Sequence, residues 1–219
     1  MIFCLVALAW SALAQNPPPT TQPADVEAAR TRWNEVYQRP KPSFNVAPNT
    51  FLKRCLERLP KEGQALDIAM GQGRNAVVLA RHGLTTTGID ISDEALRQAE
   101  ALARREGVAL RVVQADVFTF DYGDKRWDVV SLIYFNPARP MLEKLKTAVK
   151  PGGWMVIEGF GRRKQGGPPD DTKFDTNELL RRFADWHIYE YHDGDDEADW
   201  GGEPRAHVIR LLAQRPAER

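Results

Sequence analysis

Apolar residues along this chain recur with two different periods, and the chain switches repeatedly from one period to the other. Short runs that are apolar at nearly every position predict buried strands at 65–69, 85–90, 110–114, 128–133 and 154–158. Between these runs, apolar residues spaced three and four apart predict helices at 75–82, 93–105 and 141–149. This alternation predicts an α/β domain, a doubly wound, parallel sheet with helices on both faces.

The two ends of the chain depart from this alternation. Helical spacing predicts one helix at 26–37 and another around Cys55, whose thiol is therefore expected in the core. Near the C-terminus, a helix at 176–183 precedes two strand-like runs at 186–191 and 207–213. Two strands in direct succession predict an antiparallel pair added to the sheet.

The extreme N-terminus has the features of an export signal. Residues 1–14 are almost all apolar and end in the small-x-small sequence Ala12-Leu13-Ala14, but no Lys or Arg precedes Arg30. The run is shorter than the roughly 20 residues that a membrane-spanning helix needs. We therefore expect a signal peptide at 1–14, a Pro-rich linker at 15–25 and a single domain at 26–219. The mature protein would be periplasmic or secreted if the signal functions, and cytoplasmic otherwise.

Composition narrows the possible partners. The 219 residues carry 30 Lys plus Arg and 30 Asp plus Glu, a formal net charge of zero, which disfavours a phosphate-binding surface for nucleic acid. Cys4 lies in the predicted leader, so Cys55 has no partner for a disulfide within the mature chain. Stable membrane insertion after processing is not expected, and the oligomeric state is left open.

Candidate chemistry concentrates at the first strand-to-helix turn, Leu66 to Asn75. Gly71 and Gly73 permit a tight turn, and the helix that follows offers unpaired amide groups to a ligand. Asp67 is an acid inside an apolar strand, four residues before Gly71. A carboxylate there would repel a pyrophosphate but attract a cationic ammonium or sulfonium ligand.

Two further acids follow the next two strands. Asp90 ends the second strand, where a carboxylate can accept both hydroxyl groups of a ribose, and Asp116 follows the third with Val117 beside it. The carboxyl ends of parallel strands share one edge of a sheet. We therefore expect Asp67, Asp90 and Asp116 to line one ligand site.

Five segments of the chain resemble, in order, the motifs of class I S-adenosylmethionine-dependent methyltransferases: 66–75, 88–92, 114–117, 127–130 and 150–153. The resemblance implies a Rossmann-like, seven-stranded, mostly parallel sheet whose last strand is antiparallel. It also implies S-adenosyl-L-methionine as cofactor and methylation by in-line displacement at the methyl carbon. One residue departs from the pattern, because Ala69 stands where the family has its first motif glycine.

The resemblance also assigns roles to residues. Asp67 and the loop of Gly71 and Gly73 would hold the methionine part of the cofactor, Asp90 the ribose, and Asp116 with Val117 the adenine. The complete set of cofactor-binding residues that it implies is Asp67, Ala69, Gly71, Gly73, Asn75, Asp90, Ile91, Asp116 and Val117.

Within the family, the segments 71–75 and 33–37 resemble the tellurite-resistance type and related small-molecule methyltransferases. A small-molecule methyl acceptor is therefore expected, with no catalytic residue identified. Candidates for the acceptor side are Tyr37, Tyr134, Asn136 and His192.

Two charged segments look like surface loops. The acidic segment 193–199 lacks the Gly and the acidic twelfth residue of an EF-hand, so no metal site is predicted, and a solvated loop that could gate the acceptor is the better interpretation. The basic segment 162–164 is interpreted as a solvated loop near the ligand edge, with attraction of an anionic acceptor as the alternative.

Two other functions stay open. The segment Gly71-x-Gly73-x-x-Ala76 loosely matches the dinucleotide-binding fingerprint, which would make the protein an NAD-dependent oxidoreductase. That enzyme class predicts an apolar residue at the position of Asp67. A catalytically silent module that binds adenosyl ligands is the other alternative, because of Ala69 and the export signal.

Overall fold

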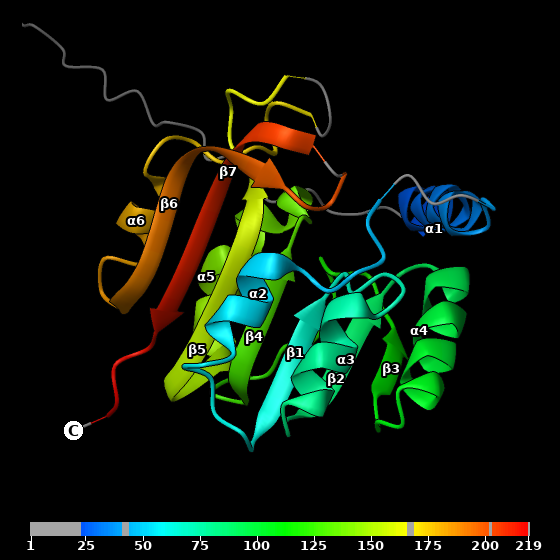
Figure 1. Ribbon diagram of the computed structural model, residues 1–219, viewed down its shortest axis with the longest axis horizontal. Coiled ribbons are helices and arrows are strands. Elements are labelled where there is room, and N and C mark those ends of the chain that lie inside the picture. Colours follow the sequence, from blue (N-terminus) through cyan, green and yellow to red (C-terminus); the bar gives the residue numbers. More distant parts are fainter. Residues whose placement is uncertain (1–22, 41–43, 166–168, 202, 219) are drawn as a thin grey trace, which may run out of the picture.

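The computed structural model describes residues 23–40, 44–165, 169–201 and 203–218. Seven strands form one sheet in the order β3-β2-β1-β4-β5-β7-β6 (Figure 1). The strands are β1 (Gln64–Ile68), β2 (Thr85–Asp90), β3 (Arg111–Gln114), β4 (Trp127–Ile133), β5 (Val149–Phe160), β6 (His187–Ala198) and β7 (Glu203–Gln214). The first five are parallel, and β7 runs antiparallel to both of its neighbours. The predicted Rossmann-like, doubly wound sheet with an antiparallel end is confirmed.

Six α-helices and one 3-10 helix accompany the sheet in the described part of the chain. They are α1 (Pro23–Tyr37), α2 (Thr50–Cys55), α3 (Arg74–Arg81), α4 (Asp93–Arg105), η1 (Asn136–Met141), α5 (Leu142–Ala148) and α6 (Glu178–Arg182). In Figure 1, α2 and α3 lie in front of the sheet and α5 behind it. None of the helices among the described residues is long and apolar enough to cross a membrane.

Alternating side chains of the central strands build a core on each face. Leu66 and Leu132 belong to the core that α5 and α6 cover, whereas Ala65 and Val129 belong to the core under α2 and α3. Cys55 lies in this second core, where burial raises the pKa of its thiol to about 12. The prediction that Cys55 lies in the core is confirmed.

Two boundaries differ from the prediction at the N-terminus and in the central sheet. The predicted leader and most of the predicted linker lie outside the described residues, but α1 begins at Pro23, so the last three residues of the predicted linker are helical. Proline is accepted in the first helical turn because its missing N–H has no partner there in any case. Strand β5 begins at Val149 rather than at 154, because Val149 already pairs with Trp127 of β4.

The prediction of a solvated loop at 193–199 is wrong. Strand β6 continues to Ala198 and pairs with β7 along this length. Its acids are placed beside polar side chains of β7: Asp193 accepts a hydrogen bond from His207 at 2.8 Å, and Asp195 and Asp196 pair with Arg205 and Arg210. Charge pairing across the hairpin therefore allows a strand where local composition favours a loop.

Candidate functional site

The turn after β1 has a strained backbone. Ala69 has a φ of 51°, and Gly71 and Gly73 have φ values of 57° and 82°. A Cβ at Gly71 would lie 2.4 Å from the Tyr37 hydroxyl, and one at Gly73 would lie 2.9 Å from Ala99 Cβ of α4. Gly71 therefore leaves room for a side chain of α1, and Gly73 for close packing of two helices. Ala69 adopts the left-handed conformation that a glycine would take without strain.

Asp67 is buried beneath this turn and is only 1% exposed. Ser131 of β4 donates a hydrogen bond of 2.6 Å to its Oδ1, while its Oδ2 has no hydrogen-bond partner within the described residues. Burial raises the pKa of Asp67 to about 7, even though the hydroxyl of Ser131 favours the charged form. An unpaired buried carboxylate oxygen of this kind is a ready partner for a cationic ligand group.

Asp90 braces the same turn from the end of β2. Its Oδ2 accepts a hydrogen bond from the Gly71 amide and its Oδ1 one from the Ser92 amide, both at 2.9 Å. Burial raises the pKa of Asp90, and these amide donors oppose the shift. Each carboxylate oxygen has a second lone pair, so Asp90 can still accept hydroxyl groups of a bound ribose.

Asp116 follows β3 at the same edge of the sheet. The Phe118 amide donates a hydrogen bond of 3.1 Å to its Oδ1, whereas its buried Oδ2 has no partner in the described part of the chain. Ile91, Val117 and Phe118 lie around the same cavity and form apolar walls beside it. The combination of one polar atom and apolar walls suits an adenine ring.

These side chains line two adjoining cavities. The larger, of about 480 Å³, is bordered by Asp90, Ile91, Asp116 and Val117, and the smaller, of about 40 Å³, by Asp67, Gly71 and Asn75. Ala69 borders both. Eight of the nine residues expected from the resemblance therefore lie at these cavities, and the exception is Gly73, whose Cα faces α4.

Helix α1 forms one wall of the larger cavity, beyond the carboxyl ends of the strands (Figure 1). Its position is fixed by polar contacts with the start of α4. Asn34 Nδ2 and Arg30 Nε donate to Asp93 Oδ2 at 3.0 and 2.6 Å, and Ser92 Oγ donates to Asn34 Oδ1 at 2.7 Å. The same helix brings Trp33 and Tyr37 to the cavity.

The far wall of the larger cavity is mostly aromatic. Of the candidate acceptor residues, Tyr37, Tyr134 and Asn136 border it, whereas His192 lies on β6 opposite Arg210 and away from both cavities. Burial raises the pKa of Tyr37 far above its ordinary value. Tyr37 is therefore a poor general base at neutral pH.

Among the aromatic residues at the cavities that sequence reasoning missed are Phe44, Phe160 and Trp200. Phe160 and Trp200 border the larger one, and Trp200 with Phe44 borders the smaller one. They come from the end of β5, from the β6–β7 turn and from the segment before α2. No local motif marks them, and the position of Trp200 directly after an acidic run was the available signal.

A buried polar network holds the β6–β7 turn against the domain. Asn49 Nδ2 donates to both oxygens of Asp199 at 3.0 Å and to Glu158 Oε1 at 3.1 Å. Arg210 Nε donates to Glu158 Oε2 at 2.7 Å, and Arg74 Nη2 forms an ion pair with Asp199 at 3.4 Å. Every carboxylate oxygen in this network has a partner.

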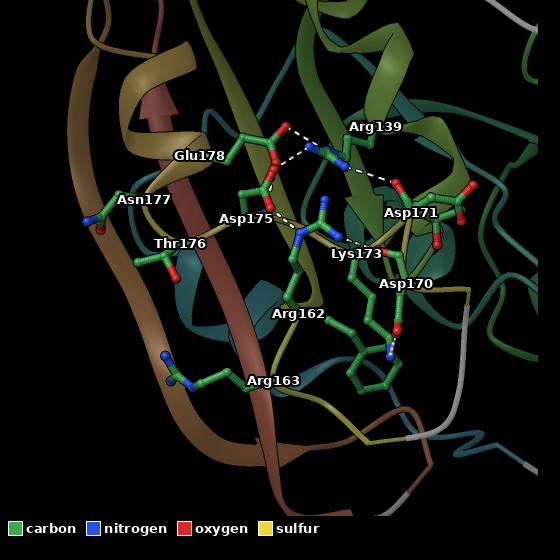
Figure 2. Close-up of polar contacts among 12 residues, drawn as sticks. Arg139, Arg162, Arg163, Asp170, Asp171, Lys173, Asp175, Thr176, Asn177 and Glu178 are labelled. Carbon is green, nitrogen blue, oxygen red and sulfur yellow. Dashed lines mark hydrogen bonds and ion pairs between the residues drawn. The ribbon is translucent and has the colours of Figure 1, made fainter.

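The basic segment 162–164 is also paired. Figure 2 shows Arg139 of η1 and Arg162 directed toward Asp175 and Glu178, and Arg139 lies 2.7 Å from Asp175 and 2.8 Å from Glu178. Arg162 forms an ion pair with Asp175 as well. Arg162 is nevertheless exposed in a turn, as expected for a solvated loop at 162–164. Acids of the following segment neutralise this charge, which leaves less of it to attract an anionic acceptor.

The described residues contain no group of three or more His, Cys, Asp or Glu side chains arranged to hold a metal ion. The carboxylate oxygens at this edge, which accept hydrogen bonds, suit the ammonium, ribose and adenine groups of an adenosyl cofactor. The unpaired oxygens of Asp67 and Asp116 lie at the ends of β1 and β3, in the order in which a methionine chain and an adenosine would pass along the edge.

Comparison with known proteins agrees with this geometry. Residues 65–153 match the family described as Methyltransferase domain. A ubiquinone biosynthesis O-methyltransferase of Alkalilimnicola ehrlichii is 31% identical over 149 residues, which cover 64% of this chain and 59% of that protein. The chain spans less than two thirds of the length of the first curated relatives that it matches.

Solved structures share the fold. TehB from Haemophilus influenzae matches with a TM-score of 0.64 at 18% identity, over 75% of this chain and 61% of that one. A structure described as conversion of a disulfide bond into a thioacetal group during echinomycin biosynthesis matches with a TM-score of 0.68, also at 18% identity, over 89% and 93% of the two chains.

Proposed function

We propose that the chain is a class I S-adenosylmethionine-dependent methyltransferase, which transfers a methyl group from S-adenosylmethionine to a small-molecule acceptor. The observation that carries the proposal is the row of acids Asp67, Asp90 and Asp116 along two adjoining cavities at the carboxyl edge of β1, β2 and β3. Two of these acids keep a buried oxygen without a partner among the described residues.

The chain's own residues would bind and orient the cofactor in three places. Asp67 and the Gly71 turn would hold the methionine part, Asp90 would accept the ribose hydroxyl groups, and Asp116 with Val117 would bind the adenine. When bound, the cofactor supplies a methyl group that is activated by the positive charge on sulfur. Asp90 also connects the methionine site with the ribose site. It accepts a hydrogen bond from the Gly71 amide, and it borders the larger cavity.

The protein's main contribution to rate would be to position the acceptor and to exclude water. Helix α1 and the β6–β7 turn both border the cavity, with Trp33 on the helix and Trp200 on the turn. Correct alignment of two reactants supplies up to roughly 7–11 kcal/mol of the barrier in favourable cases. No base is required for a soft acceptor such as a thiolate.

The acceptor side of the cavity supports a small, largely apolar acceptor. Its walls come from Tyr134, Phe135, Pro137, Phe160 and Trp200, all of them uncharged. A ring or chain of low polarity would bury its surface there. The relation to a ubiquinone biosynthesis O-methyltransferase fits this chemistry.

Calorimetric titration of the full chain with S-adenosylmethionine, S-adenosylhomocysteine and NAD tests the proposal. We expect both adenosyl ligands to bind and Asp90→Ala to weaken them at least about tenfold, or 1.4 kcal/mol. Asp124→Ala is the matched control, because it removes an exposed carboxylate just before β4, at the opposite edge of the sheet.

Each other outcome contradicts the proposal in a different way. Binding of NAD alone would identify an oxidoreductase. Binding of the adenosyl ligands without methylation of any member of a panel of thiols, phenols and amines would favour a silent adenosyl-binding module.

Export is a separate part of the proposed function. The apolar run at 1–14 favours a location outside the cytosol, although the adenosyl cofactor is made inside the cytosol. Fractionation of cells that express the full chain, with N-terminal sequencing of the product, tests it. Cleavage before Gln15 is the expected result, and an intact N-terminus in the cytosolic fraction would contradict it.

A further inference from the structure

Three aromatic rings surround the smaller cavity, which lies at the glycine turn. Tyr37 comes from α1, Phe44 from the segment before α2 and Trp200 from the β6–β7 turn. The Tyr37 and Phe44 ring centroids are 5.2 Å apart, and those of Phe44 and Trp200 are 6.0 Å apart with the rings nearly parallel at 25°. The rings therefore form one continuous aromatic wall from segments that are far apart in the sequence.

Two of these rings lie where the cavities adjoin. Tyr37 and Trp200 border both the larger and the smaller cavity, whereas Phe44 borders the smaller one. In the proposed function, the methionine part occupies the side of Asp67 and the nucleoside occupies the side of Asp90 and Asp116. The sulfur atom joins these two parts, so its place is the junction that Tyr37 and Trp200 border.

We propose that Trp200 recognises the positive charge of the sulfonium and makes the site prefer S-adenosylmethionine to S-adenosylhomocysteine. This inference rests on the proposed function of the same site. The face of an indole ring attracts a cation more strongly than that of a phenyl or phenol ring. The two ligands share the methionine ammonium and carboxylate and the adenosine, and they differ in the methyl group and in the charge on sulfur. A charge-recognising ring therefore favours the substrate and promotes release of the demethylated product.

The position of Trp200 is set by its neighbour Asp199. The Thr50 amide donates a hydrogen bond of 2.7 Å to Asp199 Oδ2, in addition to the contacts of Asp199 with Asn49 and Arg74. The Asn45 amide donates to the Trp200 carbonyl at 2.7 Å. Asp199 is thus a positioning residue, which ties the turn to α2 and to the first residue of α3 and holds Trp200 at the border of the two cavities.

The decisive measurement is the affinity of the full chain for each of the two ligands, determined by calorimetry for wild type, Trp200→Leu and Trp200→Phe. We expect Trp200→Leu to weaken S-adenosylmethionine about tenfold and S-adenosylhomocysteine less than about twofold. Trp200→Phe keeps an aromatic face and should lose only about threefold for the sulfonium ligand. This graded, charge-selective loss would not follow from lost packing alone.

Trp33→Leu is the matched control, because Trp33 borders the larger cavity but not the smaller one. It should change both affinities by the same factor. Asp199→Ala should reduce the ratio of the two affinities in the same direction as Trp200→Leu, and adding it to Trp200→Leu should leave that ratio unchanged.

Two results would overturn the inference, and they are distinguishable. If wild type binds both ligands and Trp200→Leu weakens them equally, Trp200 does not sense charge while the proposed cofactor stands. If wild type binds neither ligand, the proposed function fails and this inference fails with it. Urea unfolding of each variant shows whether a loss of binding reflects a loss of folded protein.

Discussion

Two acids at the ligand edge of the sheet, Asp67 and Asp116, are buried differently from the acids around β5–β7. At the carboxyl edge of β1–β3, Asp67 and Asp116 each keep one buried oxygen without a partner among the described residues. Around β5–β7, Glu158, Asp193 and Asp199 have partners at both oxygens. Unpaired buried acids cost folding free energy. The difference therefore separates a region built to bind a ligand from a region built to hold a shape.

The pKa values follow the same division. Burial raises the pKa of Asp67 to about 7. Burial also acts to raise the pKa of Asp193, but hydrogen bonds from the Asn177 amide, His207 and Tyr191 outweigh it and lower that pKa below its ordinary value. The ligand region is thus sensitive to pH near neutrality, and the hairpin region is stabilised by its charges.

The largest change in stability is expected when a buried acid around β5–β7 loses its cationic partner. Arg210→Ala leaves the buried Glu158 without its cation, and we expect the free energy of unfolding to fall by about 3–5 kcal/mol. Urea unfolding of the purified variant measures the loss.

Arg205→Ala is its control on the same strand, because Arg205 is 79% exposed in its pair with Asp195 and should cost less than about 1 kcal/mol. Equal losses in the two variants would show that the buried pair does not stabilise the hairpin. Glu158→Gln in the Arg210→Ala background should recover part of the loss.

A second test removes the buried, titratable carboxyl group of Asp67. Between about pH 4 and pH 7 the folded protein keeps Asp67 protonated while the unfolded chain does not, so the stability contribution of this group falls as pH rises. Asp67→Asn should remove this fall. The unfolding free energies of wild type and variant should then diverge by about 1.4 kcal/mol for each pH unit in this window.

Urea unfolding between pH 4.5 and 7.5, without ligand, measures this divergence. Asp124→Asn controls for the loss of one exposed negative charge. If the curves of wild type and Asp67→Asn run parallel throughout, burial does not hold the pKa of Asp67 near 7.

The smallest expected effect concerns backbone strain in the ligand region. Ala69→Gly should raise the free energy of unfolding by about 1 kcal/mol, because the left-handed conformation at φ 51° penalises a Cβ. Thermal unfolding of both proteins would show it as a higher midpoint for the variant. Ala76→Gly, in the interior of α3, is the opposite control and should destabilise the protein. A lower midpoint for Ala69→Gly would mean that Ala69 is not strained.

Much of the ligand region could be predicted from sequence because its signals are local. Asp67 and Gly71 are four residues apart, and Asp90 and Asp116 each stand at the end of an apolar run. Parallel strands then bring such ends to one edge. Asp67, Asp90 and Asp116 were therefore predicted together, and the structure places them at adjoining cavities.

The hairpin region could not be predicted in the same way. The acids at 193–199 have the composition of a loop, and their strand conformation depends on pairing with β7 across the turn. Asn49 is 150 positions from Asp199 in sequence, and the pattern around neither residue indicates the other. Phe44 and Trp200 meet for the same reason, and the aromatic wall was missed.

The sequence by itself determined the alternation of strands and helices, the antiparallel end of the sheet and the acids at the strand ends, because periodicity and chain neighbours fix these features locally. Only the tertiary structure decided which buried carboxylates have partners and which rings border both cavities. Those outcomes depend on contacts between segments far apart in the chain, such as that of Asn49 with Asp199. Such a contact decides whether a buried carboxylate has a partner or remains free to bind a ligand.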